Sequence, residues 1–215
     1  HTVAASPWRG GKGDEVREVA DSAKAHGVKL AVYLSPADLY QLKTNPKNPA
    51  AWKLCGLSLQ LSQQMAAAEQ NFTRAVEAFP KDAEVWFYLA RVQYLQSQLK
   101  PAENSARQAL RVYPDFADAH LQLALILDAL HEDTGALNHY QTAIELNQKQ
   151  RRPLALPYLY GSDLLFRLGR YDEALSYLTQ AIAISPPNST IYFNRGRVLE
   201  KSGKPTDAEK DYQQA

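Results

Sequence analysis

The sequence contains a single cysteine, Cys55, so no disulfide can form within the chain and no cysteine-based metal site can be built. It also lacks an apolar run of about 18 residues, the length that a membrane-spanning helix needs. Neither sign of charge is in excess, because 24 Lys and Arg stand against 23 Asp and Glu. Composition therefore gives no electrostatic reason to expect binding to nucleic acid or to an anionic membrane.

What the sequence does contain is an internal repeat, which decides the fold before any single motif does. Two sets of alanines recur at spacings of 34, 34, 38 and 34 residues. The first set is Ala68, Ala102, Ala136, Ala174 and Ala208, and the second is Ala75, Ala109, Ala143, Ala181 and Ala215. This pattern predicts units at 49–82, 83–116, 117–150 and 155–188, with a partial unit at 189–215 and a four-residue insertion before the fourth unit.

Other residue types keep the same phase. Small residues recur at Gly56, Ala90, Ala124, Ser162 and Gly196, and an aromatic residue or histidine opens each unit at Trp52, Trp86, His120, Tyr158 and Tyr192. Proline closes three units at Pro80, Pro114 and Pro186, whereas Gln148 takes its place in the third. A period of 34 residues with this order resembles the tetratricopeptide repeat (TPR).

Each unit is expected to form two antiparallel helices. Apolar residues at helical spacing give each helix one apolar stripe, and the small residue allows the second helix to approach closely. A single hairpin cannot bury its own apolar face, so neighbouring hairpins stack. The resemblance implies a mainly α fold, a right-handed TPR-type solenoid over residues 41–215. Gln93 departs from the pattern, because a leucine is expected there.

Residues 1–40 do not carry the repeat, and their pattern predicts a short strand, a helix and a second strand at Val28 to Leu34. Two stretches, Ala4 to Asp14 and His26 to Pro36, resemble part of the alpha-L-fucosidase family of glycoside hydrolases. The resemblance covers residues 1–37 and implies one β-α-β step of a barrel that typically needs about 250 residues. Retaining hydrolysis needs two carboxyl groups across the sugar, and this segment cannot supply the pair.

Several motifs that carry chemistry elsewhere are incomplete. The run Gly10-Gly11-Lys12-Gly13 lacks the Ser or Thr that follows lysine in a phosphate-binding loop. Cys55 lies at a position that the repeat buries, which favours a small apolar side chain over a nucleophile. His131 and His139 are eight residues apart, and His120 takes a core aromatic position, so packing or surface roles are favoured over zinc binding. We therefore expect no catalytic residue, no metal site and no cofactor.

The resemblance to TPR proteins implies that the first helix of each hairpin lines a concave face. A peptide with apolar anchors and a few acidic residues suits the aromatic and arginine side chains on that face. The residues expected to contact a partner are Lys53, Leu57, Phe87, Arg91, Tyr94, Leu125, Asp128, Asp163, Phe166 and Arg197. One subclass of the family clamps the carboxylate tail of chaperones, but Leu57, Tyr88, Asp118 and Gln122 replace its polar residues, so no such clamp is expected here.

The sequence thus favours a non-enzymatic scaffold that binds a protein or peptide partner. The alternative is an inactive fragment of a modular alpha-L-fucosidase-like glycoside hydrolase. Because the sequence begins at His1 and stops inside its fifth unit, we expect it to be a piece of a longer product. The compartment is left open, with a bacterial cytoplasm or periplasm favoured. An uncapped last unit also predicts self-association through its exposed apolar surface.

Overall fold

The computed structural model of the chain describes residues 49–149, 154–185 and 188–215. These residues contain helices and no strand. The predicted β-α-β segment at 1–40, its division from the array and the insertion at 151–154, apart from Leu154, lie outside the described residues. The chain separates into two compact units, unit 1 up to Val112 and unit 2 from Tyr113 to Ala215.

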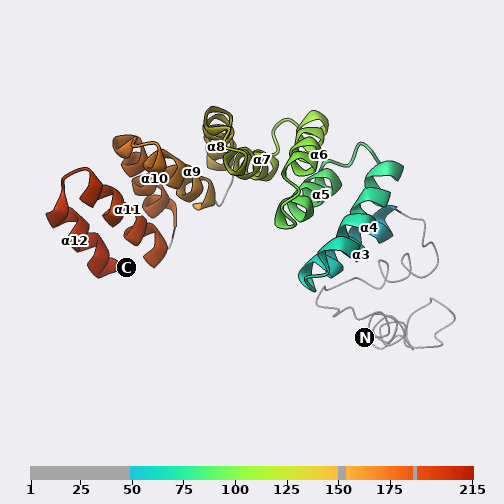
Figure 1. The fold of residues 1–215 in the computed structure, drawn as a ribbon, viewed down its shortest axis with the longest axis horizontal. Coiled ribbons are helices and arrows are strands. Elements are labelled where there is room, and N and C mark those ends of the chain that lie inside the picture. The colour runs from blue at the N-terminus through green and yellow to red at the C-terminus, as the bar shows by residue number, and fades with distance from the viewer. Residues whose placement is uncertain (1–48, 150–153, 186–187) are drawn as a thin grey trace. The chain divides into compact units, whose positions relative to one another are not determined.

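Unit 1 holds two described helical hairpins (Figure 1). The first is α3 (Pro49–Leu61) with α4 (Met65–Ala78), and the second is α5 (Ala83–Leu95) with α6 (Leu99–Val112). The α5 helix packs against both α3 and α4. A core of Leu59, Ala68, Phe72, Ala75, Val76, Val85, Leu89 and Val92 joins the two hairpins.

Unit 2 holds three hairpins of the same kind. They are α7 (Ala117–Ala129) with α8 (Asp133–Gln148), α9 (Leu156–Arg167) with α10 (Tyr171–Ile184), and α11 (Ser189–Lys201) with α12 (Pro205–Gln214). Each first helix contacts the first helix of the next hairpin, and α8 and α10 pack on the following first helices. The predicted helical hairpins are therefore confirmed for the described part of the array.

Most of the repeated alanines are buried within the stacked helices. Eight of the ten, at 68, 75, 102, 109, 136, 143, 174 and 181, have no exposed surface. A Cβ built on Gly56 would lie 2.6 Å from the ring of Phe72, and one on Gly196 would lie 2.6 Å from the ring of Tyr212. In the first and fifth units the small residue therefore makes room for a side chain of the second helix, as the sequence predicts.

Proline marks the end of the second helix. The α4 helix ends at Ala78, two residues before Pro80, and α6 ends at Val112, two residues before Pro114. The α8 helix has 16 residues against 14 in α4 and α6, and it ends at Gln148 itself. Replacing proline by Gln148 thus lets the helix continue, because glutamine keeps the backbone N–H that proline lacks.

The aromatic residue or histidine that opens a unit reaches back to the proline position before it. Trp86 Nε1 donates to the carbonyl of Pro80 at 2.9 Å, and His120 Nε2 lies 2.9 Å from the carbonyl of Pro114. Where Gln148 replaces proline, its amide donates to the hydroxyl of Tyr158 at 2.8 Å. Histidine can stand at this position because its ring nitrogen donates the same bond as the Trp indole.

Candidate functional site

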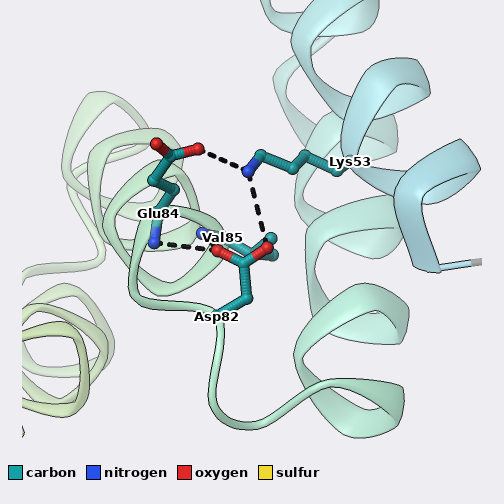
Figure 2. A network of polar contacts seen from close by, with 4 residues as sticks. All are labelled: Lys53, Asp82, Glu84 and Val85. Carbon is teal, nitrogen blue, oxygen red and sulfur yellow. Dashed lines mark hydrogen bonds and ion pairs between the residues drawn. The ribbon is translucent and has the colours of Figure 1, made fainter. Parts of the chain in front are cut away.

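In unit 1 the face formed by the first helices begins with Lys53 on α3. Its ammonium pairs with Glu84 and, at 3.4 Å, with Asp82 (Figure 2). Asp82 also caps α5, because its carboxylate accepts from the backbone N–H groups of Glu84 and Val85. Lys53 therefore links hairpin α3–α4 to the start of α5, and its charge is already matched by two carboxylates.

The protonation of Lys53 reflects this environment. Burial acts to lower the pKa of the ammonium, but the hydrogen bond from Lys53 to Glu84 and the charges of Asp82 and Glu84 outweigh it. The net result is a pKa above the ordinary lysine value. Lys53 thus stays charged at every physiological pH, although a ligand would have to compete with Asp82 and Glu84 for it.

The α5 helix supplies the other predicted residues of unit 1. Arg91 is exposed, and no carboxylate among the described residues forms an ion pair with it. Phe87 and Tyr94 are half-buried, and the Phe87 ring lies 5.2 Å from that of Tyr88. Leu57 of α3 packs against the core of unit 1. Of the two cations predicted to contact a partner in this unit, Lys53 is ion-paired within the fold, and Arg91 remains available to an anionic ligand.

In unit 2 a charged bridge joins α7 to α9. Arg167 Nη2 donates to both oxygens of Asp128 at 2.6 and 2.7 Å, and its Nε lies 3.3 Å from Asp163. Arg167 was not among the predicted contact residues. The (i, i+4) spacing of Asp163 and Arg167 in the sequence could have indicated their ion pair. Nothing in the sequence indicated the pairing of Arg167 with Asp128, which lies 39 residues away.

Three predicted contact residues come together in a small hollow between α9 and α11. The hollow is lined by Ser162, Asp163, Phe166, Leu178, Asn194, Arg197 and Val198. The Arg197 guanidinium carbon lies 4.8 Å from the centre of the Phe166 ring, a cation–π distance. No described carboxylate forms an ion pair with Arg197, so its charge is held in place by an aromatic ring and remains open to an anionic group.

Three other side chains singled out in the sequence have local roles. His120 and His139 face each other with their Nδ1 atoms 2.9 Å apart, a pairing that their separation of 19 residues did not suggest. Cys55 is half-buried rather than fully buried, and burial raises the pKa of its thiol, which disfavours a nucleophilic thiolate. Within the described residues, no group of three or more His, Cys, Asp or Glu side chains could hold a metal ion.

The stacked helical hairpins within each unit define a helical-repeat protein. The tetratricopeptide repeat family model matches residues 56–102, 96–151 and 162–215. These matches cover more than half of the chain, so the chain belongs to the tetratricopeptide repeat family. No helix in the described segments is both long and apolar enough to cross a membrane.

Solved structures show the same fold. Pseudomonas aeruginosa PilF matches with a TM-score of 0.71 and 17% identity, over 91% of this chain and 82% of that chain. MamA matches with a TM-score of 0.68 and 19% identity, over 77% of this chain and 88% of that chain. YrrB, described as a TPR protein with an unusual peptide-binding site, matches with a TM-score of 0.65 and 20% identity, over 83% of this chain and 90% of that chain.

A curated relative matches a short stretch. The protein named "Putative alpha-L-fucosidase 1" from Oryza sativa subsp. japonica is 54% identical over 41 residues. The match covers 19% of this chain and 8% of that relative. It agrees with the family resemblance seen in the sequence and does not establish catalysis.

Proposed function

We propose that this chain is a scaffold without catalytic activity that binds an acidic peptide segment of a protein partner on its first-helix face. Arg197 carries the proposal, because its guanidinium stacks on Phe166 beside a hollow and lacks a carboxylate partner among the described residues. Arg91 offers a second cation on α5 of unit 1. Lys53, Asp128 and Asp163 are ion-paired within the fold, so they are expected to shape the face rather than to dominate affinity.

The test is fluorescence polarisation with a panel of labelled peptides that combine acidic and aromatic residues. We expect Arg197→Ala to weaken binding by about tenfold or more, as loss of a buried contact residue does. Arg91→Ala should weaken it less, because Arg91 is more exposed. The matched control is Arg74→Ala, which removes an exposed arginine from the second helix α4. Equal binding by wild type and both first-helix variants would contradict the proposal.

The same panel should include a chaperone C-terminal tail, for which we expect no binding because the clamp residues are replaced. Self-association is a second partner proposal, favoured by the exposed rings of Phe193 (51%) and Tyr212 (37%), whose centroids lie 5.9 Å apart. Sedimentation equilibrium checks it. A monomer mass at all concentrations, identical for wild type and Phe193→Ser, would contradict it.

The 41-residue match favours one further candidate, a remnant of a modular fucosidase. Hydrolysis of a chromogenic fucoside distinguishes it from the scaffold. We expect no turnover, because the match covers 8% of that relative. Turnover that Arg197→Ala leaves unchanged would favour the hydrolase instead.

A further inference from the structure

A second hollow lies in unit 2, lined mainly by the second helices α8 and α10, and has a volume of about 220 Å³. Four of its residues, Thr134, Leu137, Asn138 and Gln141, come from successive turns of one side of α8. The others come from the end of α9, from the residue before α10 and from the first half of α10. The full lining is Thr134, Leu137, Asn138, Gln141, Leu165, Arg170, Glu173 and Tyr177. None of these residues belongs to the proposed partner surface.

The charges in this hollow compensate each other. Arg170 donates two hydrogen bonds to Glu173, at 2.6 and 2.7 Å, and both side chains belong to the first turn region of α10. An anionic ligand would therefore meet Glu173, and a cationic ligand would meet Arg170. The arrangement favours an uncharged ligand.

Some of the hydrogen-bonding groups around the rim of the hollow already bind one another within the protein. Tyr177 donates from its hydroxyl to Gln141 at 2.7 Å, and Gln141 donates in turn to Glu145 at 2.9 Å. Burial, followed by the charge of Glu173, raises the pKa of Tyr177, so its hydroxyl stays protonated. The ring of Tyr177 is held by Gly161 and by an edge contact with Tyr158 at 6.0 Å, so it forms a fixed wall.

Two polar side chains remain available. Thr134 and Asn138 are exposed, and neither side chain has a hydrogen-bond partner among the described residues. The Asn138 carboxamide has both hydrogen-bond donors and an acceptor, and the Thr134 hydroxyl can donate or accept a hydrogen bond. Such groups match the vicinal hydroxyls of a polyol, each of which also donates and accepts. The floor is apolar, formed by the buried Leu165 and by Leu137.

Size and lining together limit the ligand. The hollow is smaller than the about 300–1,000 Å³ of a pocket for a drug-sized molecule, which restricts it to roughly one ring. An apolar side chain would leave the polar rim unsatisfied, whereas a ring with hydroxyls on its edge and C–H groups on its face would use both rim and floor. We propose that the hollow between α8 and α10 binds one neutral polyhydroxylated ring, such as a sugar unit.

The experiment is a titration of the ¹⁵N-labelled chain with methyl glycosides of common hexoses, followed by NMR. We expect at least one glycoside to shift the side-chain amide signals of Asn138 and Gln141, with millimolar affinity. Asn138→Ala should weaken that binding by about tenfold, the effect of losing one or two hydrogen bonds. Asn104→Ala is the matched control, because Asn104 occupies the same repeat position on α6 and is also exposed.

Arg197→Ala should leave glycoside binding unchanged, so this proposal and the peptide proposal can fail separately. The absence of amide shifts with every glycoside would overturn the proposal. So would binding that Asn138→Ala does not weaken. Shifts of the Asn138 signal by N-acetyl-leucine methylamide in preference to the glycosides would also overturn it, because they would identify a peptide site instead.

Discussion

At the scale of single residues, the turn inside each hairpin requires a left-handed backbone. The residues concerned are Gln63, Ser97, His131, Gly169 and Gly203, with φ between 60° and 77°. They recur at the repeat spacing, and the residue after each one donates a 2.9 Å bond to a carbonyl five residues earlier in its own turn. Glycine adopts this conformation without strain, whereas a residue with a side chain is strained in it.

Ser97→Gly is therefore expected to stabilise the protein. An L-residue in the left-handed region costs about 1–2 kcal/mol, and glycine loses about 0.5–1 kcal/mol more chain entropy on folding. The net gain should be about 0.5–1 kcal/mol, measurable as a rise in the urea midpoint. Gly169→Ala, the reverse change in unit 2, should lower the midpoint. A lower midpoint for Ser97→Gly would contradict the strain argument.

Asp82 serves two purposes that separate variants can distinguish. Asp82→Ala removes both the cap of α5 and the partner of Lys53, and it should cost about 1–2 kcal/mol. Asp82→Asn keeps a capping oxygen and should cost clearly less. Asn188→Ala removes only a cap, since the Asn188 side chain accepts from the Thr190 N–H. Thermal unfolding of the three variants checks this order, and equal losses for Asp82→Asn and Asp82→Ala would show that capping contributes little.

At the scale of the elements, two facing positions in each hairpin, one on each helix, fill the space between the helices. Gly56 accommodates the Phe72 ring in the first hairpin, whereas the second hairpin has Ala90 and Ala106 at the same two positions. The two pairs are alternative ways of filling one space. A change to one partner should therefore depend on the other.

Gly56→Ala is expected to destabilise by about 1–2 kcal/mol, because overpacking at 2.6 Å exceeds the gain in helix propensity. In the background of Phe72→Ala the same change should be neutral or stabilising, and a double-mutant cycle measures that coupling. Gly135→Ala is the matched control, since its Cβ would meet only a Leu127 methyl group at 3.3 Å. Additive losses in the cycle would rule out the packing explanation.

The sequence predicted these elements well because their causes are local and periodic. Alanine, glycine and proline positions determined the hairpins, whereas the greater length of α8, where Gln148 replaces proline, was found only in the structure. What the sequence could not supply were contacts between positions far apart. The ion pairs of Lys53 with Asp82 and Glu84, the Arg167 bridge to Asp128 and the His120–His139 pair all join different helices, and no spacing rule reveals them.

At the scale of the molecule, neighbouring hairpins are joined by polar as well as apolar contacts. Gln93, at a position where the sequence predicts leucine, is 8% exposed and accepts from Ser105 at 2.7 Å. Its amide donates to Glu69 at 3.3 Å, and Gln96 and Gln98 donate to the other oxygen of Glu69. This network ties α4 to the second hairpin.

Glu69→Ala should weaken that junction without affecting unit 2. It leaves the buried Gln93 amide without its acceptor, at a cost of about 1–3 kcal/mol. Because repeat arrays are stabilised by nearest-neighbour interfaces, hydrogen exchange should quicken in α3 and α4 and stay unchanged in α9 and α10. Glu145→Ala, which removes an exposed acceptor on α8, is the control. Uniform loss of protection along the chain would instead indicate one cooperative unit.

The half-buried thiol of Cys55 gives the chain a built-in reporter. Alkylating reagents attack the thiolate, which burial disfavours, and no other thiol competes with it in the sequence. The rate at which a maleimide modifies the folded protein would therefore follow how often the first hairpin exposes that sulfur. A faster modification of Cys55 would therefore report a loosened junction elsewhere in unit 1, without a label engineered into the chain.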